Sequence, residues 1–294
     1  MRSILLDTLR PTSPQQRTKL LTTGLLFLFL IYTLTPLFYV IVSVTKSDAE
    51  LFDTFGLWFA RDFHVIKNLR SVFTYGNGIY GRWLLNTATY SIASALGASV
   101  FASAAGYAFA KFEFAGRRGL FATILGAIMV PHTALVIPLF LLLTQIGLVD
   151  TPAAVILPSM VSPFGVYLMR IYAERAVPDE MIDAARIDGA GEFRIFTLVA
   201  FRMMVPGFVT VMLLTFVAAW NNYFLPLVVL SDAHYFPVTV GLASWYQQAS
   251  AGSGAEVLFS LVLTGALVSI TPVLIVFLLM QRYWQSDLAF GSVK

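Results

Sequence analysis

The sequence predicts an all-α integral membrane protein with six transmembrane helices. Hydrophobic residues make up 58% of the 294 residues and charged residues only 12%, whereas about a quarter of the residues of a soluble domain are charged. Six segments contain no Asp, Glu, Lys or Arg and are long enough to cross a bilayer, which takes roughly 20 apolar residues. These segments are 20–45, 83–110, 119–149, 151–169, 203–231 and 257–281.

The distribution of Lys and Arg predicts which side of the membrane each loop faces. Six spans place both termini on one side, and most of the 19 Lys and Arg residues fall on that side. The positive-inside rule then puts both termini in the cytoplasm. We therefore expect a cytoplasmic tail over 1–19, a first span and outer loop over 20–82, a core of five spans over 83–285 and a cytoplasmic tail over 286–294. The net charge of +3 reflects this topology, and no nucleic-acid partner is expected.

The segment 233–255 also lacks charged side chains, and a seventh span there would move the C-terminus outside. His234, Gln247 and Gln248 lower its hydrophobicity, while Trp245 and Tyr246 suit a membrane interface. We expect an outer re-entrant or surface helix.

A charged island over 178–196 interrupts the apolar sequence. Pro178 suits a first helical turn, the acidic residues after it suit the positive end of a helix dipole, and Gly189 suits a following turn. These residues predict a short helix, a bend and a second helix. At helical spacing the small side chains leave one face nearly flat, which predicts a docking surface made up of Met181, Ala184, Ala185 and Asp188.

Polar and aromatic residues within or beside the spans are candidates for contact with a transported solute. They are Asn86, Trp220, Asn221, Asn222 and Tyr223. The alternative is structural, because Asn in spans commonly forms interhelical hydrogen bonds and Trp and Tyr commonly anchor span ends at the interface.

The spans lack the ionisable residues that ion-coupled carriers usually need, apart from His132. The chain also lacks a G-x-x-x-x-G-K-[ST] phosphate loop, so any energy from ATP must come through a separate subunit. We therefore expect no catalytic residue, metal or cofactor in this chain. Because it has no Cys, disulfides and thiolate metal sites are excluded.

A membrane enzyme is the competing class. Asp179, Asp183 and Asp188 could hold Mg²⁺ for lipid-phosphate chemistry. Acidic residues in a first helical turn are also expected from dipole stabilisation alone, and no second acidic cluster completes such a site.

The island resembles a family signature. Its segment 183–190, Asp-Ala-Ala-Arg-Ile-Asp-Gly-Ala, is similar to the Glu-Ala-Ala-x-x-x-Gly pattern of permease subunits of ABC importers. Segments 105–118, 162–170 and 220–227 resemble carbohydrate permeases of the maltose-transporter type. Two departures are Asp183 in place of the usual Glu and Phe201-Arg202 in place of Leu-Pro.

The resemblance implies a type I ABC importer permease fold in the inner membrane, with a cytoplasmic coupling loop over 173–202 between the fourth and fifth spans. It implies four further components in the transporter: a second homologous permease, two ATPase subunits that bind ATP and Mg²⁺, and an extracytoplasmic solute-binding protein. The cargo would be an oligosaccharide or related polyol. The residues implied in ATPase coupling are Glu180, Asp183, Ala184, Ala185, Asp188, Gly189 and Ala190, and those of a C-terminal ATPase contact are Gly291, Ser292, Val293 and Lys294.

Overall fold

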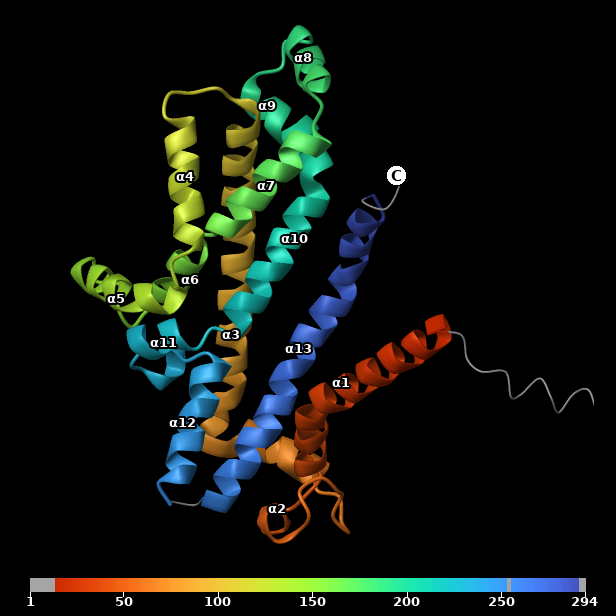
Figure 1. The fold of residues 1–294 in the computed structure, drawn as a ribbon. Helices are drawn as coiled ribbons and strands as arrows, with labels where there is room; N and C mark the ends of the chain where they lie inside the picture. Colours follow the sequence, from red (N-terminus) through yellow and green to blue (C-terminus); the bar gives the residue numbers. More distant parts are fainter. Residues whose placement is uncertain (1–13, 253–254, 291–294) are drawn as a thin grey trace, which may run out of the picture.

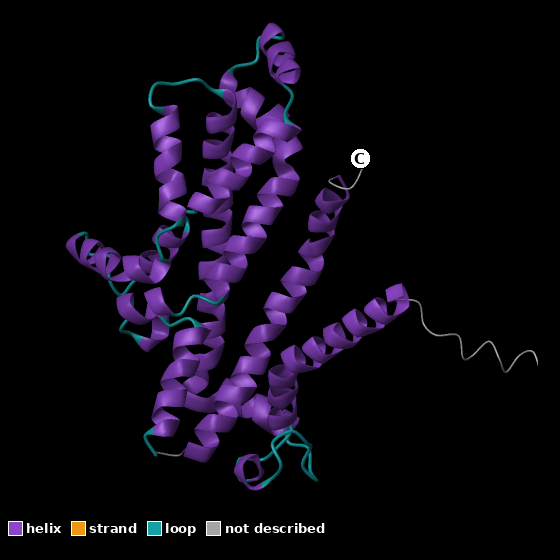
Figure 2. Ribbon diagram, in the orientation of Figure 1, coloured by secondary structure: helices purple, strands orange, loops and turns teal. Residues whose placement is uncertain are grey.

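The computed structural model describes residues 14–252 and 255–290, with side chains described over 18–252 and 258–279. Every regular element in these ranges is helical (Figure 2), as predicted. The α-helices are α1 Pro14–Val44, α2 Glu50–Asp53, α3 Val65–Lys111, α4 Arg117–Ile128, α5 Val136–Gln145, α6 Pro152–Ser159, α7 Pro163–Ala176, α8 Asp179–Ile187, α9 Glu192–Ile195, α10 Phe201–Trp220, α11 Phe224–Val229, α12 Val238–Ser250 and α13 Ala255–Phe290. Three short helices complete the chain: η2 His132–Leu135, η3 Phe196–Ala200 and η4 Ala233–Tyr235.

Five stretches of the described residues are long and apolar enough to cross a membrane: Thr18–Val44, Val65–Lys111, Pro152–Ala176, Glu192–Trp220 and Leu258–Leu279. The sixth predicted span, 119–149, is a pair of helical segments, Arg117–Ile128 and His132–Gln145, bent by 102°. The break coincides with Pro131, a proline inside the charge-free segment. Pro131 has an extended backbone at the break (φ −59°, ψ 128°) and carries no N–H donor to continue the helix. Six spans result if the bent pair counts as one.

Three helix ends differ from the ends of the charge-free segments. α10 ends at Trp220 rather than at 231, and the side chain of Asn221 donates to the carbonyl of Val217 at the end of the helix (2.8 Å). α3 begins at Val65, inside the predicted outer loop, and its axis is broken at residues 76–78, which have φ of 57°, 60° and 77°. At the other end of the chain, α13 continues to Phe290, through part of the predicted 286–294 tail.

In the described part of the segment 233–255, up to residue 252, the helical elements are η4 and the 13-residue α12. At 1.5 Å per residue α12 is about 20 Å long, too short for a hydrocarbon core of about 30 Å. It packs against α3 and α13 (Figure 1). The segment is therefore not a seventh span.

The small-residue face of α3 lies at the centre of the core. Figure 1 shows α3, α7 and α10 packed side by side, with α4 flanking α7. A Cβ atom added to Gly97 or Gly106 would lie 2.6 Å from Met160 or Met169. At Gly106 the added atom would also meet the backbone of Met169 and Arg170, so glycine there allows the close approach of α3 and α7 by which small residues promote helix packing in lipid.

α1 stands apart from this core (Figure 1), and only 6% of its most apolar window is buried. From Leu20 onward its sequence carries no charged residue, and apolar residues fall on every side of the helix. Such a helix needs lipid or another membrane subunit around it.

Candidate functional site

The charged island forms α8, which lies beyond the ends of α3, α7 and α10, and α9, which leads through η3 into α10 (Figure 1). Pro178 is the extended residue before α8 (φ −65°, ψ 142°), Asp179 and Glu180 lie in the first turn and Arg186 in the last. Both signs of charge complement the helix dipole. The predicted order of short helix, bend and second helix is confirmed.

Ile182 attaches α8 to the membrane core. Its side chain is only 3% exposed and belongs to a buried cluster formed by α3, α7, α8, α9, η3 and α10. The members of that cluster are Ala102, Tyr107, Met169, Ala173, Val177, Ile182, Ile195, Ala200, Met204 and Val211. Through this cluster the side chain of Ile182 shares a buried core with residues of α7 and α10.

Gly189 makes the turn after α8 with a left-handed backbone (φ 78°) that glycine adopts without strain. Its N–H donates to the carbonyl of Arg186, and the N–H of Ala190 donates to that of Ala185, both at 3.0 Å. Ala185 and Ala190 are partly buried against the cluster around Ile182. The predicted flat docking face is thus divided: Ala185 faces the protein, whereas Ala184 is exposed.

Two ion pairs join α8 to its neighbours, and a third lies within α8 itself. The guanidinium of Arg186 contacts Asp183 (3.1 Å) and Glu192 on α9 (2.8 Å). The hydrogen bond that Arg186 donates to the Glu192 carboxylate, and then the one that it donates to Asp183, raise the pKa of Arg186. At the start of α8, Asp179 accepts a hydrogen bond from Lys111 at the end of α3 (2.7 Å).

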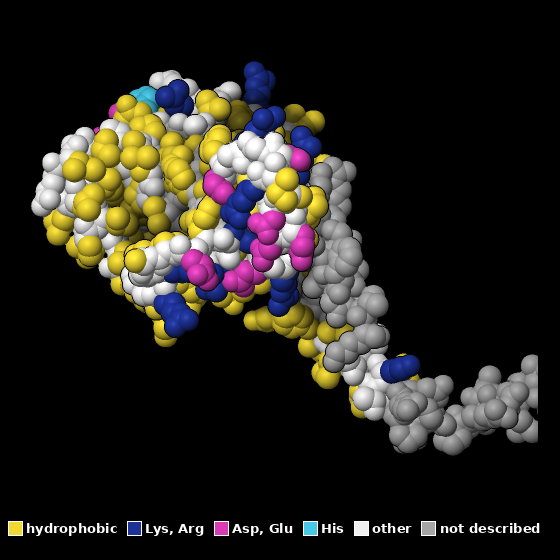
Figure 3. All heavy atoms as spheres, turned by 90° about the horizontal axis from the view of Figure 1, so that it is seen from above, with side chains coloured by type: hydrophobic (Ala, Val, Ile, Leu, Met, Phe, Trp, Pro, Cys, Tyr) yellow, Lys and Arg dark blue, Asp and Glu magenta, His cyan; other side chains and the backbone are white. Residues whose placement is uncertain are grey.

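The outward surface of α8 and α9 exposes large apolar side chains. Ile187 is 86% exposed, Phe193 is 81% exposed, and Met181 is also exposed. Figure 3, which looks down on this end of the molecule, shows acidic and basic side chains among hydrophobic ones. Exposed apolar groups rimmed by polar residues are typical of a protein–protein interaction site.

The candidate solute-path residues lie apart from this island. The Asn86 amide donates to the carbonyls of His234 (2.7 Å) and Phe236 (3.0 Å). Trp220 is buried and donates to the carbonyl of Ser269 (3.2 Å). The carbonyl of Asn222 accepts from Thr239 (2.8 Å), and Tyr223 is partly exposed.

Trp220 and Asn221 do line a common cavity of ≈ 260 Å³, together with Thr239 and Ser269. Asn86 does not line it. Of the five candidates, Asn86 has the contacts of the structural alternative, whereas Trp220 and Asn221 border an open space.

Within residues 18–252 and 258–279, no three His, Cys, Asp or Glu side chains gather as a metal site. Asp179 is paired with Lys111, and Asp183 with Arg186. Two of the three aspartates proposed for Mg²⁺ are thus held in ion pairs and no metal-binding group forms among the described residues, so the magnesium-enzyme alternative has no support.

Sequence reasoning missed the residues that hold and expose the island. Ile182, Ile187 and Phe193 are large apolar residues in a charged segment, and that mismatch was the available signal. The ion pairs of Lys111 and Glu192 could not be predicted from the sequence, because they depend on the positions of α3 and α9 relative to α8.

A model of the family described as the binding-protein-dependent transport system inner membrane component matches residues 98–286. The chain belongs to this family. It is 34% identical to the arabinooligosaccharides transport system permease protein AraQ of Halalkalibacterium halodurans, over 94% of this chain and 96% of that protein. It is 35% identical to the lactose transport system permease protein LacG of Rhizobium radiobacter, over 65% of this chain and 67% of that protein.

The fold matches that of a chain in a bacterial ABC transporter involved in import of the acidic polysaccharide alginate. The TM-score is 0.80, the identity is 24%, and 93% of this chain and 99% of that chain are covered. This permease is therefore a multi-pass transport subunit of an ABC importer and not an enzyme. Members of its family work with a second permease, an ATPase and a solute-binding protein.

Proposed function

We propose that this permease forms half of the translocation path of an importer for a carbohydrate, an oligosaccharide or related polyol. The names of its relatives support a sugar cargo, since AraQ is named for arabinooligosaccharides and LacG for lactose. A second homologous permease forms the other half. Two ATPase subunits bind ATP and Mg²⁺, and an extracytoplasmic solute-binding protein delivers the cargo.

The ATPase docks on α8 and α9. The observation that carries this proposal is that α8 has one buried and one exposed apolar side chain. Ile182 is buried in the core and anchors the helix, whereas Ile187 on the same helix is almost fully exposed. Pressure on the exposed side is transmitted through Ile182 to α7 and α10. Glu180, Ala184 and Asp188 are exposed and meet the partner directly, whereas Asp183, Ala185, Gly189 and Ala190 maintain the shape of the turn.

Trp220 and Asn221 are the path candidates best placed to meet cargo, because they border the ≈ 260 Å³ cavity. The C-terminal contact with the ATPase, Gly291 to Lys294, lies outside the described residues and stays a prediction from the resemblance.

Both termini and α8 face the cytoplasm, and α12 faces outward. The chain contains no Cys, so single cysteines test this orientation directly. In intact cells an impermeant thiol reagent should label Gln248→Cys on α12 and spare Ile187→Cys on α8. Labelling of Ile187→Cys from outside would contradict the orientation.

The function is tested by reconstituting the complete importer in proteoliposomes with its solute-binding protein. ATP hydrolysis should be coupled to uptake, and mass spectrometry of ligand retained by the binding protein should identify a carbohydrate. The double variant Ile187→Gln/Phe193→Gln should insert normally yet lose coupling. Retention of a peptide or an amino acid by the binding protein would contradict the carbohydrate assignment while leaving the coupling proposal open to its own test.

A further inference from the structure

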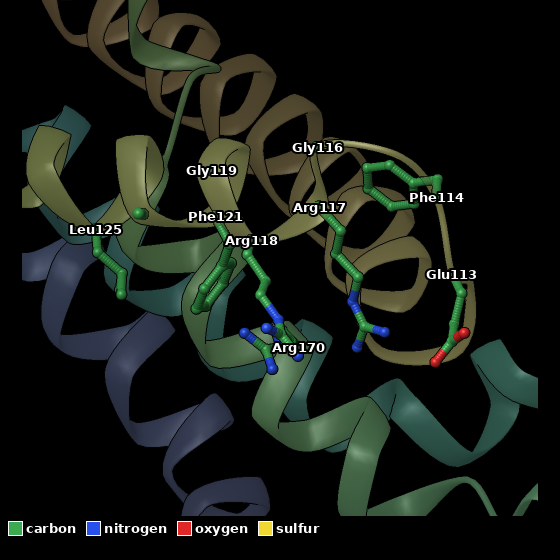
Figure 4. A pocket seen from close by; sticks show the side chains of 10 residues that line it. Glu113, Phe114, Gly116, Arg117, Arg118, Gly119, Phe121, Leu125 and Arg170 are labelled. Carbon is green, nitrogen blue, oxygen red and sulfur yellow. The ribbon is translucent and has the colours of Figure 1, made fainter.

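A second open cavity, of ≈ 770 Å³, lies between the first turn of α4 and α7. Its lining includes Arg117, Arg118, Phe121, Leu125 and Arg170. Figure 4 shows the three guanidinium groups facing the same space, with Leu125 at one end. Because α4 begins directly after the linker from α3, this cavity is at the end of the core where α8 lies (Figure 1).

The charge of this cavity is unbalanced. Its lining holds three arginines and one carboxylate, that of Glu113. Arg170 is fixed by two contacts, an ion pair with Glu174 (2.9 Å) and the ring of Phe121, 4.0 Å from its guanidinium carbon. Arg117 and Arg118 have no acidic partner within 4.0 Å among the described residues. Two of the three positive charges are therefore available to a ligand.

The start of α4 adds to this positive charge. The first turn contains Arg117 and Arg118 but no acidic residue, and no side chain caps it. The first N–H groups of a helix have no partner within the helix, and the dipole makes that end positive. Cations at this end are unfavourable by themselves, so an anion in the cavity would be stabilised by both the arginines and the helix.

The other end of the cavity is apolar. Phe121, Ala122 and Leu125 line it, and α4 buries none of its residues in the protein. Leu120, Leu125 and Ile128 are exposed along the same helix, where lipid chains would surround them. A ligand that fits both ends carries a negative charge joined to a hydrocarbon chain.

We propose that this cavity binds an anionic phospholipid, with its phosphate between Arg117, Arg118 and Arg170 and an acyl chain along Phe121 and Leu125. Basic pockets between transmembrane helices are suited to such headgroups. The cavity lies where apolar helices end, which is the depth of lipid phosphates. Free phosphate would satisfy the arginines but leave the apolar end exposed, so the lipid is the better fit.

The test uses the intact importer purified in detergent and delipidated, with lipid binding followed by native mass spectrometry. Phosphatidylglycerol should bind the wild type at least tenfold more tightly than phosphatidylcholine. The variant Arg117→Gln/Arg118→Gln should lose that preference. The matched control Lys67→Gln/Arg70→Gln removes the same charge from exposed positions on α3 and should keep it.

Two further arms separate the sources of the anion. Glycerol phosphate and inorganic phosphate at the same concentration should not displace phosphatidylglycerol, and Leu125→Gln should weaken lipid binding with all three arginines in place. Unchanged preference in the double arginine variant would overturn the proposal. Displacement by phosphate alone, or loss of ATPase assembly with lipid binding intact, would also overturn it, because the arginines would then serve a soluble anion or a protein contact.

Discussion

The two ends of the helical core hold their short helices in different ways. At one end α8 has one buried anchor, Ile182, and surface ion pairs. The two ion pairs of Arg186 are exposed, and such pairs contribute little to stability, whereas the pair between Lys111 and Asp179 has a buried lysine side chain. At the other end η4 and α12 are fixed to α3 by buried rings and by side chains that hydrogen-bond to backbone groups.

The contacts at the α12 end are dense. From α3, Trp83 donates to the carbonyl of Ala233 (2.8 Å), Tyr90 donates to that of Tyr235 (2.9 Å), and Thr87 accepts from the N–H of Val238 (2.7 Å). Trp83 also packs against Trp245 on α12, with ring centroids 4.8 Å apart.

This difference suggests a division of labour. We expect η4 and α12 to move with α3 as one rigid body, because side chains of α3 form hydrogen bonds with the backbone groups of residues 233–238. The α8 end has an exposed apolar side and a single buried anchor, so a partner can move it without dismantling the core. The predictions below test this contrast.

The largest effect is expected from Ile182→Ala. Truncating this buried side chain should cost about 4 kcal/mol of local stability through lost burial and the cavity left behind. We expect faster hydrogen exchange over α8 in the assembled importer, with ATP hydrolysis uncoupled from uptake. The comparison variant Ile187→Ala, at an exposed position, should keep the exchange of α8 unchanged and weaken only ATPase binding. Equal exchange in both variants would show that Ile182 is not the anchor.

Gly241→Ala should disrupt the α12 end. An added Cβ would lie 2.1 Å from the buried ring of Trp83, and overpacking a filled core costs about 3 kcal/mol at the upper end of its usual range. The thermal unfolding midpoint of the purified complex should fall. Gly81→Ala serves as the control, because no atom lies within 4 Å of its added Cβ; similar midpoints for the two variants would contradict tight packing of α12 on α3.

Asn86→Ala should cost about 2 kcal/mol, because the carbonyls of His234 and Phe236 lose their donor. Uptake measured per folded complex should keep its KM. Asn221→Ala is the comparison, since that amide bonds only within its own helix end and borders the cavity beside Trp220. A raised KM in Asn86→Ala with unchanged stability would contradict the structural role and show that Asn86 contacts the solute.

The smallest effect is expected from Gly189→Ala, which places a side chain on a left-handed backbone and costs about 1 kcal/mol. Its neighbour Gly191 has φ −72°, and neither position has an atom within 4 Å of an added Cβ. Gly191→Ala is therefore a matched control. Coupling of ATP hydrolysis to uptake should decline only in Gly189→Ala. An equal decline in both variants would show that the added methyl groups disturb the contact surface, and that the left-handed backbone of the turn is not the cause.

Much of the fold could be predicted from charge-free segments, because lipid demands long apolar helices. The first and last spans were close for this reason, at Thr18–Val44 and Leu258–Leu279. Pro131 lies inside the segment 119–149 and favours an interruption there, but the angle of 102° depends on the surrounding packing, which the sequence does not contain. The early end of α10 was missed because Asn221 was interpreted as part of a path rather than as a helix terminus.

The sequence predicted which segment forms the candidate site, but not which of its side chains face the partner. The turn at Gly189 follows from the backbone that glycine allows, and the sequence was sufficient for it. Which side of α8 faces the core depends on α7 and α10, so Ala185 was assigned to the outer face and Ile182 to no role.

The most direct test of the account compares thiol protection at the two ends. In this Cys-free chain, Ile187→Cys and Gln248→Cys should both react with a small thiol reagent when the permease pair is purified without its ATPase. Adding the ATPase should protect Ile187→Cys at least tenfold and leave Gln248→Cys unchanged. Equal reactivity of Ile187→Cys with and without bound ATPase would contradict the assignment of α8 as the surface on which the ATPase docks.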